Sequence, residues 1–153
     1  MKIIKNILVS LGIIFVIVVA AISYIAMGSS SFKKEYSPFA EKFLFDYSQA
    51  WKISDVEGRL SSEFLADLNS MKSRNAISLF ESLGKLESIS DVEINQYNSG
   101  TNGETGIFIF KAVFNNAKTA VTLTIRKNNN GIKVLGLNIN ITEELRNNRE
   151  IAT

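Results

Sequence analysis

The stretch FESLGKLES, residues 80–88, marks the point where the pattern of the chain changes from helix to strand. Before Gly84 the apolar residues recur every three or four positions, whereas after it they alternate with polar ones. A period near 3.6 is typical of an amphipathic helix, and a period of 2 of a half-buried strand. Gly84 also suits the left-handed conformation that ends a helix. We therefore expect helices first and a sheet second, which is an α+β fold.

Four strands are expected after Gly84, because four runs rich in β-branched and aromatic residues follow in series. The runs are Leu86–Tyr97, Thr105–Asn115, Lys118–Arg126 and Ile132–Ile141. Their connectors contain glycine and asparagine, which accept positive φ, so consecutive strands are expected to pair as antiparallel hairpins. In the last run the apolar parity shifts, which predicts a β-bulge near Gly136. The expected sheet is four-stranded, antiparallel and curved.

Upstream, the segment FAEKFLFDYSQAW, residues 39–51, has an aromatic residue at every fourth position. This spacing predicts a helix with one apolar stripe, starting near Pro38, since proline is tolerated in the first turn. The sequence SDVE at 54–57 has the form of a capping box and predicts a short second helix. Further helical patterns run from Ser61 and from Ser73. The folded domain is expected to span residues 36–141.

A segment without charge precedes this domain. Residues 7–27 read ILVSLGIIFVIVVAAISYIAM, and a helix of that length spans roughly 30 Å, the thickness of a hydrocarbon core. Lys2 and Lys5 lie before it, in an expected cytoplasmic leader of residues 1–6. Because positive residues favour the cytoplasmic side, the domain is expected beyond the membrane. The sequence thus predicts a single-pass protein of the inner (cytoplasmic) membrane with a periplasmic or extracellular domain.

Two alternatives remain for residues 7–27. A cleaved secretory signal would have a shorter apolar core, of about 7 to 15 residues. A buried helix of a soluble protein would be apolar on one stripe only. The segment is therefore interpreted as a retained anchor, followed by a linker over residues 28–35 and, after the domain, by a polar tail over residues 142–153.

Composition excludes several classes of function. The chain contains no cysteine and no histidine, which removes thiol nucleophiles, disulfides and the usual zinc sites. The formal charge of +2 belongs to Lys2 and Lys5, so the domain lacks the dense basic face that nucleic-acid binding needs. Glu87, Asp91 and Glu93 share one strand parity and are interpreted as a solvated face. No cofactor and no metal ion is expected.

Three segments carry a resemblance to a known fold. They are FAEKFLFDYSQAW, FESLGKLES and NNNGIKVLGLNI, the last at residues 128–139. Together they resemble small bacterial domains of the NTF2-like, or cystatin-like, class, in which helices pack in a cone against a curved sheet. The resemblance covers about residues 36–141. The membrane layout is also similar to that of bitopic components of secretion machines.

The resemblance implies where a site would lie. Enzymes with this fold place an acid, a tyrosine or a histidine inside the open end of the cone, and Asp46, Tyr47 and Tyr97 are the matching residue types, with Trp51 as an apolar wall. Two functions follow from it. The preferred one is a non-enzymatic binding or assembly module with a protein partner in the cell envelope or a small ligand. The alternative is a small isomerase, dehydratase or hydrolase using Asp46 and Tyr47.

Overall fold

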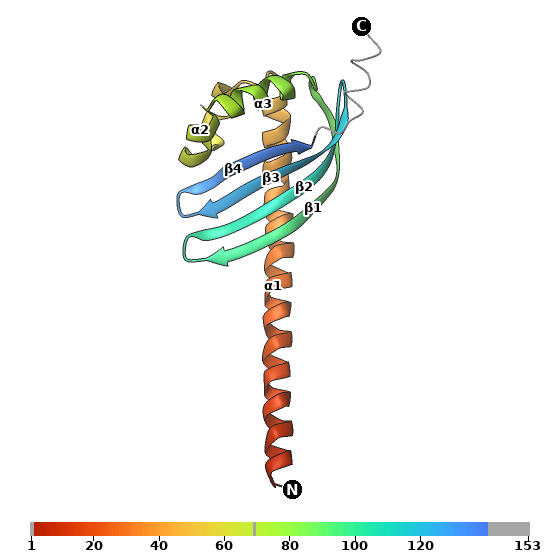
Figure 1. Ribbon diagram of the computed structural model, residues 1–153, viewed down its shortest axis with the longest axis vertical. Coiled ribbons are helices and arrows are strands. Elements are labelled where there is room, and N and C mark those ends of the chain that lie inside the picture. Colours follow the sequence, from red (N-terminus) through yellow and green to blue (C-terminus); the bar gives the residue numbers. More distant parts are fainter. Residues whose placement is uncertain (1, 69, 141–153) are drawn as a thin grey trace.

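The computed structural model describes residues 2–68 and 70–140, with side chains described except at 2–13, 21–22, 24–26 and 71–74. Figure 1 shows one long helix, α1 (Lys2–Ser48), with a curved sheet packed along its C-terminal half. Shorter helices close the end of this assembly. The α+β class expected from the sequence is confirmed.

The sheet contains β1 (Leu86–Gly100), β2 (Gly103–Phe114), β3 (Lys118–Asn128) and β4 (Gly131–Asn140). The strands pair in chain order and every pair is antiparallel, as expected. The predicted bulge is also confirmed. Thr124 pairs with Gly136 and Ile125 with Val134, which leaves Leu135 as the extra residue.

The edge strand β1 is irregular along its length. Its register against β2 shifts at three places, and Asp91 has a positive φ of 49°. Bulges bend a strand and increase its local twist. They also disrupt the flat edge that could pair with another chain. The irregularity of β1 therefore contributes to the curvature of the sheet and protects its free edge.

The core lies between α1 and the concave face of the sheet. Phe108 and Phe110 of β2 are fully buried, and so are Val121 and Leu123 of β3. Phe43 of α1 is buried against this layer at 1% exposure. Alternate residues of β2 and β3 thus supply the packed face, as the period of 2 predicted.

The expected linker at residues 28–35 is wrong, because these residues continue α1. Phe32 is the reason, since its ring lies 5.4 Å from that of Tyr97 and 5.9 Å from that of Phe108. Burying this side chain favours helix over the local Gly/Ser preference, as tertiary packing commonly does. Pro38 consequently lies inside α1. The Ser37 hydroxyl donates a 2.6 Å hydrogen bond to the Lys33 carbonyl in the preceding turn.

The segment after α1 also differs from expectation. The capping box at 54–57 does not form, and two 3-10 turns, η1 (Ile53–Asp55) and η2 (Glu57–Arg59), take its place. Helices α2 (Ser62–Leu68) and α3 (Met71–Glu81) follow. Ser61 caps α2 by accepting a 3.1 Å hydrogen bond from the Phe64 backbone N–H. Gly84, at φ 78°, adopts the expected left-handed conformation.

In the part of the chain that the structure describes, no helix is both long enough and apolar enough to cross a membrane. The expected transmembrane segment, residues 7–27, lies within the backbone of α1. Its side chains at 7–13, 21–22 and 24–26 lie outside the described residues, and so does the expected tail, 142–153.

Candidate functional site

An apolar cavity of about 80 Å³ lies where α1 meets the short helices and β4. Phe43 and Tyr47 line it from α1, Phe80 from α3 and Leu137 from β4. The remaining lining side chains are aliphatic or aromatic, so the Tyr47 hydroxyl is the one polar side-chain group of a lining residue. A single water needs about 10–15 Å³ of such space, so the cavity has room for several non-hydrogen atoms.

Tyr47 is 4% exposed, and its hydroxyl has no hydrogen-bond partner among the described residues. Burial, with a smaller contribution from the negative charge of Glu81, raises the pKa of Tyr47 to about 12. The phenol therefore stays neutral near pH 7 and keeps its proton as a donor. A buried hydroxyl without a partner costs about 1–3 kcal/mol, which an acceptor on a ligand would offset.

Trp51 does not line this cavity but packs against two residues that do. It is buried in the left-handed region, at φ 54°, and its indole N–H donates a 3.0 Å hydrogen bond to the Gly84 carbonyl. Its ring centroid lies 5.3 Å from that of Tyr47 and 5.7 Å from that of Phe80. Trp51 thus ties the end of α1 to the start of the sheet and touches two residues that line the cavity.

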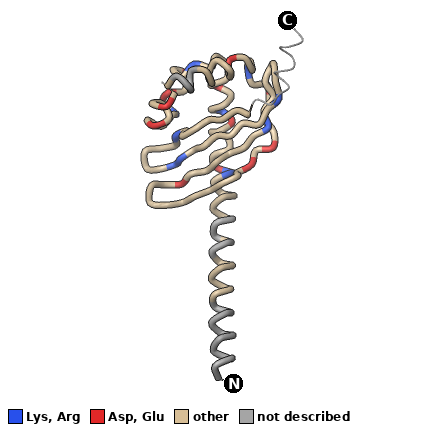
Figure 2. Tube along the Cα trace, viewed as in Figure 1, with Lys and Arg blue, Asp and Glu red and all other residues tan. Residues whose placement is uncertain are grey.

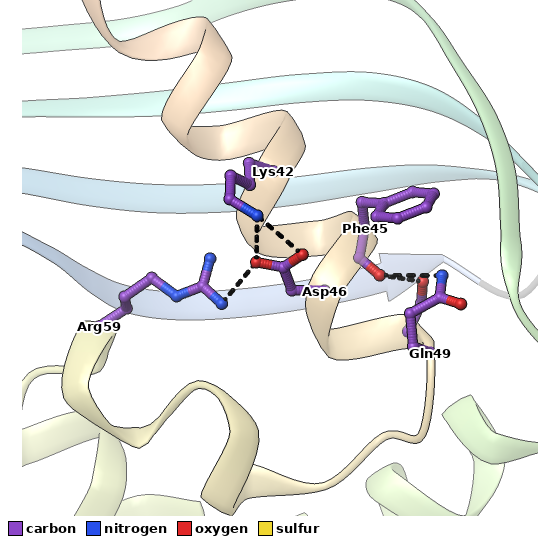
Figure 3. A network of polar contacts seen from close by, with 6 residues as sticks. Lys42, Phe45, Asp46, Gln49 and Arg59 are labelled. Atoms are coloured by element: carbon purple, nitrogen blue, oxygen red, sulfur yellow. Dashed lines mark hydrogen bonds and ion pairs between the residues drawn. The ribbon is translucent and has the colours of Figure 1, made fainter.

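Asp46 is held in an ion-pair network with Lys42 and Arg59 (Figure 3). It is not among the residues that line the cavity. Its carboxylate lies 2.9 Å from Lys42 Nζ and 2.8 Å from a guanidinium nitrogen of Arg59. The hydrogen bond from Lys42 and the charge of Arg59 lower the pKa of Asp46 below its ordinary value. The Arg59 guanidinium also lies over the ring of Phe43, 5.6 Å from its centroid. The network fastens η2 to the outside of α1.

Tyr97 lies at a different place. Its hydroxyl donates a 2.5 Å hydrogen bond to Glu104, and its ring packs beside Gly28 and Phe32. Gly28 precedes Tyr47 by about five turns of α1, roughly 28 Å. Of the four predicted site residues, the structure brings Tyr47 and Trp51 together, places Asp46 in a surface network and places Tyr97 far along the helix.

Two acidic residues of β1, Glu87 and Asp91, each have a polar partner of their own. Glu87 accepts a 2.8 Å hydrogen bond from the Asn115 side chain, and Asp91 forms a 2.7 Å ion pair with Lys111. Within residues 2–68 and 70–140 no group of three or more acidic side chains could hold a metal ion. Figure 2 shows acidic and basic residues interspersed over the strands and short helices.

Sequence reasoning missed the walls of the cavity and the role of Arg59. Phe64, Leu68 and Phe80 have helical spacing, which indicates buried faces but gives no sign of a space left between them. The pair of Asp46 with Arg59 depends on how η2 folds back on α1, which sequence spacing does not encode.

No family model, no curated protein and no solved structure matches this chain. The interpretation of the site therefore depends on its own geometry.

Proposed function

We propose that this chain is a membrane-anchored, extracytoplasmic binding or assembly module without catalytic activity. The observation that carries the proposal is the chemistry of the cavity beside Tyr47. Its lining is apolar apart from one neutral, unpartnered hydroxyl. Such a lining suits a small apolar ligand, or an apolar side chain of a protein partner, that presents one hydrogen-bond acceptor.

The enzymatic alternative has weaker support from the same geometry. It requires Asp46 and Tyr47 to act together, since acid–base catalysis usually needs two groups with pKa values moved apart at one reacting centre. Asp46 is instead paired with Lys42 and Arg59, with its pKa lowered, and does not line the cavity. Tyr47 has a pKa of about 12, too high for a base near pH 7.

Membrane anchorage is proposed on the sequence of residues 7–27 and on the length of α1. Among the described side chains of that segment, the apolar run Ile14–Val19 is exposed, with Phe15 at 67%. A helix exposing apolar side chains on all sides is stable when lipid surrounds it. The lysines of the leader favour a cytoplasmic N-terminus, which puts the domain on the far side of the inner membrane.

The NTF2-like class is part of the same proposal. A helix lying against the concave face of a curved antiparallel meander supports it (Figure 1). With the anchor, this layout is similar to that of the scaffold components of secretion machines, which favours a partner in the cell envelope.

Ligand binding can be tested through Trp51, because it is the single tryptophan of the chain and its ring touches Tyr47. The full chain in lipid nanodiscs is titrated with a series of short-chain ketones and, as controls, with alkanes of equal size. We expect ketones to change the Trp51 emission saturably and to bind several-fold more weakly to Tyr47→Phe. The proposal fails if ketone and alkane bind alike, or if Tyr47→Phe leaves the ketone affinity unchanged.

Topology can be tested with Ser99→Cys, because the chain contains no other thiol. We expect a membrane-impermeant maleimide to label intact spheroplasts. Labelling that appears only after the cytoplasmic membrane is broken would show that the proposed orientation is wrong.

A further inference from the structure

A second, polar hollow lies between the tips of two hairpins. The turn at 100–103 joins β1 to β2, the turn at 128–130 precedes β4, and together with Arg126 they line an open hollow of about 590 Å³. The two tips touch, since a Cβ added to Gly103 would lie 3.0 Å from the Cβ of Asn128. The Asn128 side chain also accepts a 2.9 Å hydrogen bond from the Asn130 N–H, which shapes its own turn.

The residues of this hollow can recognise an anion. Arg126 is the only charged residue among those that line it, and none of the lining residues is a carboxylate. Thr101, Asn102 and Asn129 add hydroxyl and amide donors. Two carboxylates lie near Arg126. That of Glu104 accepts a hydrogen bond from the Tyr97 hydroxyl, and that of Glu63 is held first by hydrogen bonds from its own backbone and Ser61, with Arg126 as the smallest of the influences that lower its pKa. A guanidinium beside several neutral donors suits the oxygens of a phosphate group.

The position of the hollow along α1 points to the source of that phosphate. Gly28 directly follows the apolar segment 7–27, and a Cβ added to it would lie 2.8 Å from the Tyr97 ring. The turn begins at Gly100, three residues beyond Tyr97, so it lies within about 10 Å of that level. Figure 1 shows the same arrangement, with the β1–β2 hairpin on the side of the domain that faces the N-terminal part of α1.

This distance is comparable with the thickness of a lipid headgroup layer. The hydrocarbon core is about 30 Å thick and the whole bilayer about 40–45 Å, which leaves roughly 5–8 Å of headgroups on each side. If residues 7–27 span the core, the β1–β2 tip lies within about 10 Å of the core boundary, in this layer or just beyond it. We propose that the hollow at residues 100–103, 128–130 and Arg126 binds the phosphate of a phospholipid headgroup in the membrane that anchors the chain. This inference depends on the proposed anchorage.

The test uses the full chain, reconstituted in vesicles of phosphatidylglycerol and phosphatidylcholine that contain a lipid with a nitroxide on its headgroup. A fluorophore is attached to Ser99→Cys, beside the hollow, or to Ser88→Cys near the opposite end of the same strand. We expect strong quenching at position 99 and weak quenching at 88. Adding Arg126→Gln should lower lipid occupancy at 99 about fivefold, as expected for one basic residue at a membrane surface.

Lys118→Gln is the matched control, since Lys118 is an exposed cation at the other end of β3. The inference is overturned if positions 99 and 88 are quenched equally, or if Arg126→Gln acts no differently from Lys118→Gln. It is also overturned if millimolar inorganic phosphate removes the Arg126-dependent quenching, since the site would then be one for free phosphate. If alkaline carbonate extracts the chain from the vesicles, the anchorage itself is refuted. If the chain stays in the vesicles but the fluorophore at position 99 is not quenched, only the headgroup site is refuted.

Discussion

Two tyrosine hydroxyls in this chain have opposite surroundings. That of Tyr97 donates to a carboxylate, whereas that of Tyr47 is buried without a partner among the described residues. Burying a polar atom without a hydrogen-bond partner costs free energy, whereas a buried polar atom with a partner can stabilise the fold. The hydroxyl of Tyr97 therefore contributes to stability, while that of Tyr47 opposes it and is available to a ligand.

Removing each hydroxyl should separate these roles. Tyr97→Phe is expected to lower the free energy of unfolding by roughly 1.5 kcal/mol, the low end for a hydrogen bond to a charged group. Tyr47→Phe is expected to raise it by about 1 kcal/mol, because an unsatisfied buried group is removed. Urea unfolding of the full chain in micelles, followed by Trp51 emission, measures both. A loss of stability in Tyr47→Phe as large as that in Tyr97→Phe would show that Tyr47 has a structural partner.

Asp46 should give a pH-dependent contribution. Its pKa in the folded chain is lowered from the ordinary 3.8, first by Lys42 and then by Arg59. The stabilisation is therefore present above pH 3.8 and disappears as the pH falls through the lower folded value. Asp46→Asn should cost about 0.2–1 kcal/mol at pH 7, the usual range for surface pairs, and nothing after Asp46 is protonated.

Unfolding titrations of wild type and Asp46→Asn at several pH values between 7 and 2 measure this difference. Glu41→Gln is the control, because Glu41 lies on the same helix as Asp46 and forms no ion pair among the described residues. A difference between wild type and Asp46→Asn that persists at the lowest pH would contradict the ion-pair account.

At the scale of elements, the contact of α1 with β2 depends on a glycine. Gly106 is buried, and a Cβ added there would overlap the Phe32 ring. Gly136 of β4 has open space around the same position. The absence of a side chain at Gly106 therefore allows α1 to lie close to the sheet.

Gly106→Ala should destabilise the domain by about 1–3 kcal/mol, the usual cost of overpacking. Gly136→Ala should be close to neutral, since both glycines lie within strands and only Gly106 faces a packed ring. Thermal unfolding of the two variants compares them directly. Equal melting temperatures would mean that Phe32 moves aside without cost.

The sequence predicted the sheet well because its signals are local. The alternation of Val121, Leu123 and Ile125, the turn glycines and the shift in parity beside Gly136 each act within a few residues. The helix through residues 28–35 was missed because Phe32 folds with β1 and β2, which follow about 60 residues or more later. The separation of Tyr97 from Tyr47 was missed for the same reason, since it depends on strand register against α1.

At the scale of the whole molecule, the boundary of the domain lies earlier than residue 36. Phe32 is 2% exposed and packs on Tyr36, Tyr97 and Phe108. A fragment of residues 28–140 is expected to unfold cooperatively in solution. A fragment of residues 36–140 should be less stable by about 3–5 kcal/mol, the usual cost of removing a buried phenylalanine.

Urea unfolding of the two fragments without detergent provides the measurement. A fragment of residues 28–140 that remains insoluble would mean that the sheet needs a partner chain or lipid to cover it. Equal midpoints for the two fragments would mean that Phe32 adds nothing to the core.

Because α1 is one continuous helix, it can act as a rigid connection between its N-terminal end and the sheet. At 1.5 Å per residue its 47 residues extend about 70 Å, and the buried Phe32 and Phe43 pack its C-terminal half against the sheet. A flexible tether would absorb a displacement, whereas a continuous helix is expected to transmit an axial shift or a twist applied at its N-terminal end to β1 and to the hairpin tips. In the proposed membrane orientation, tilting α1 by about 20°, an ordinary angle for membrane helices, would move those tips towards or away from the lipid surface.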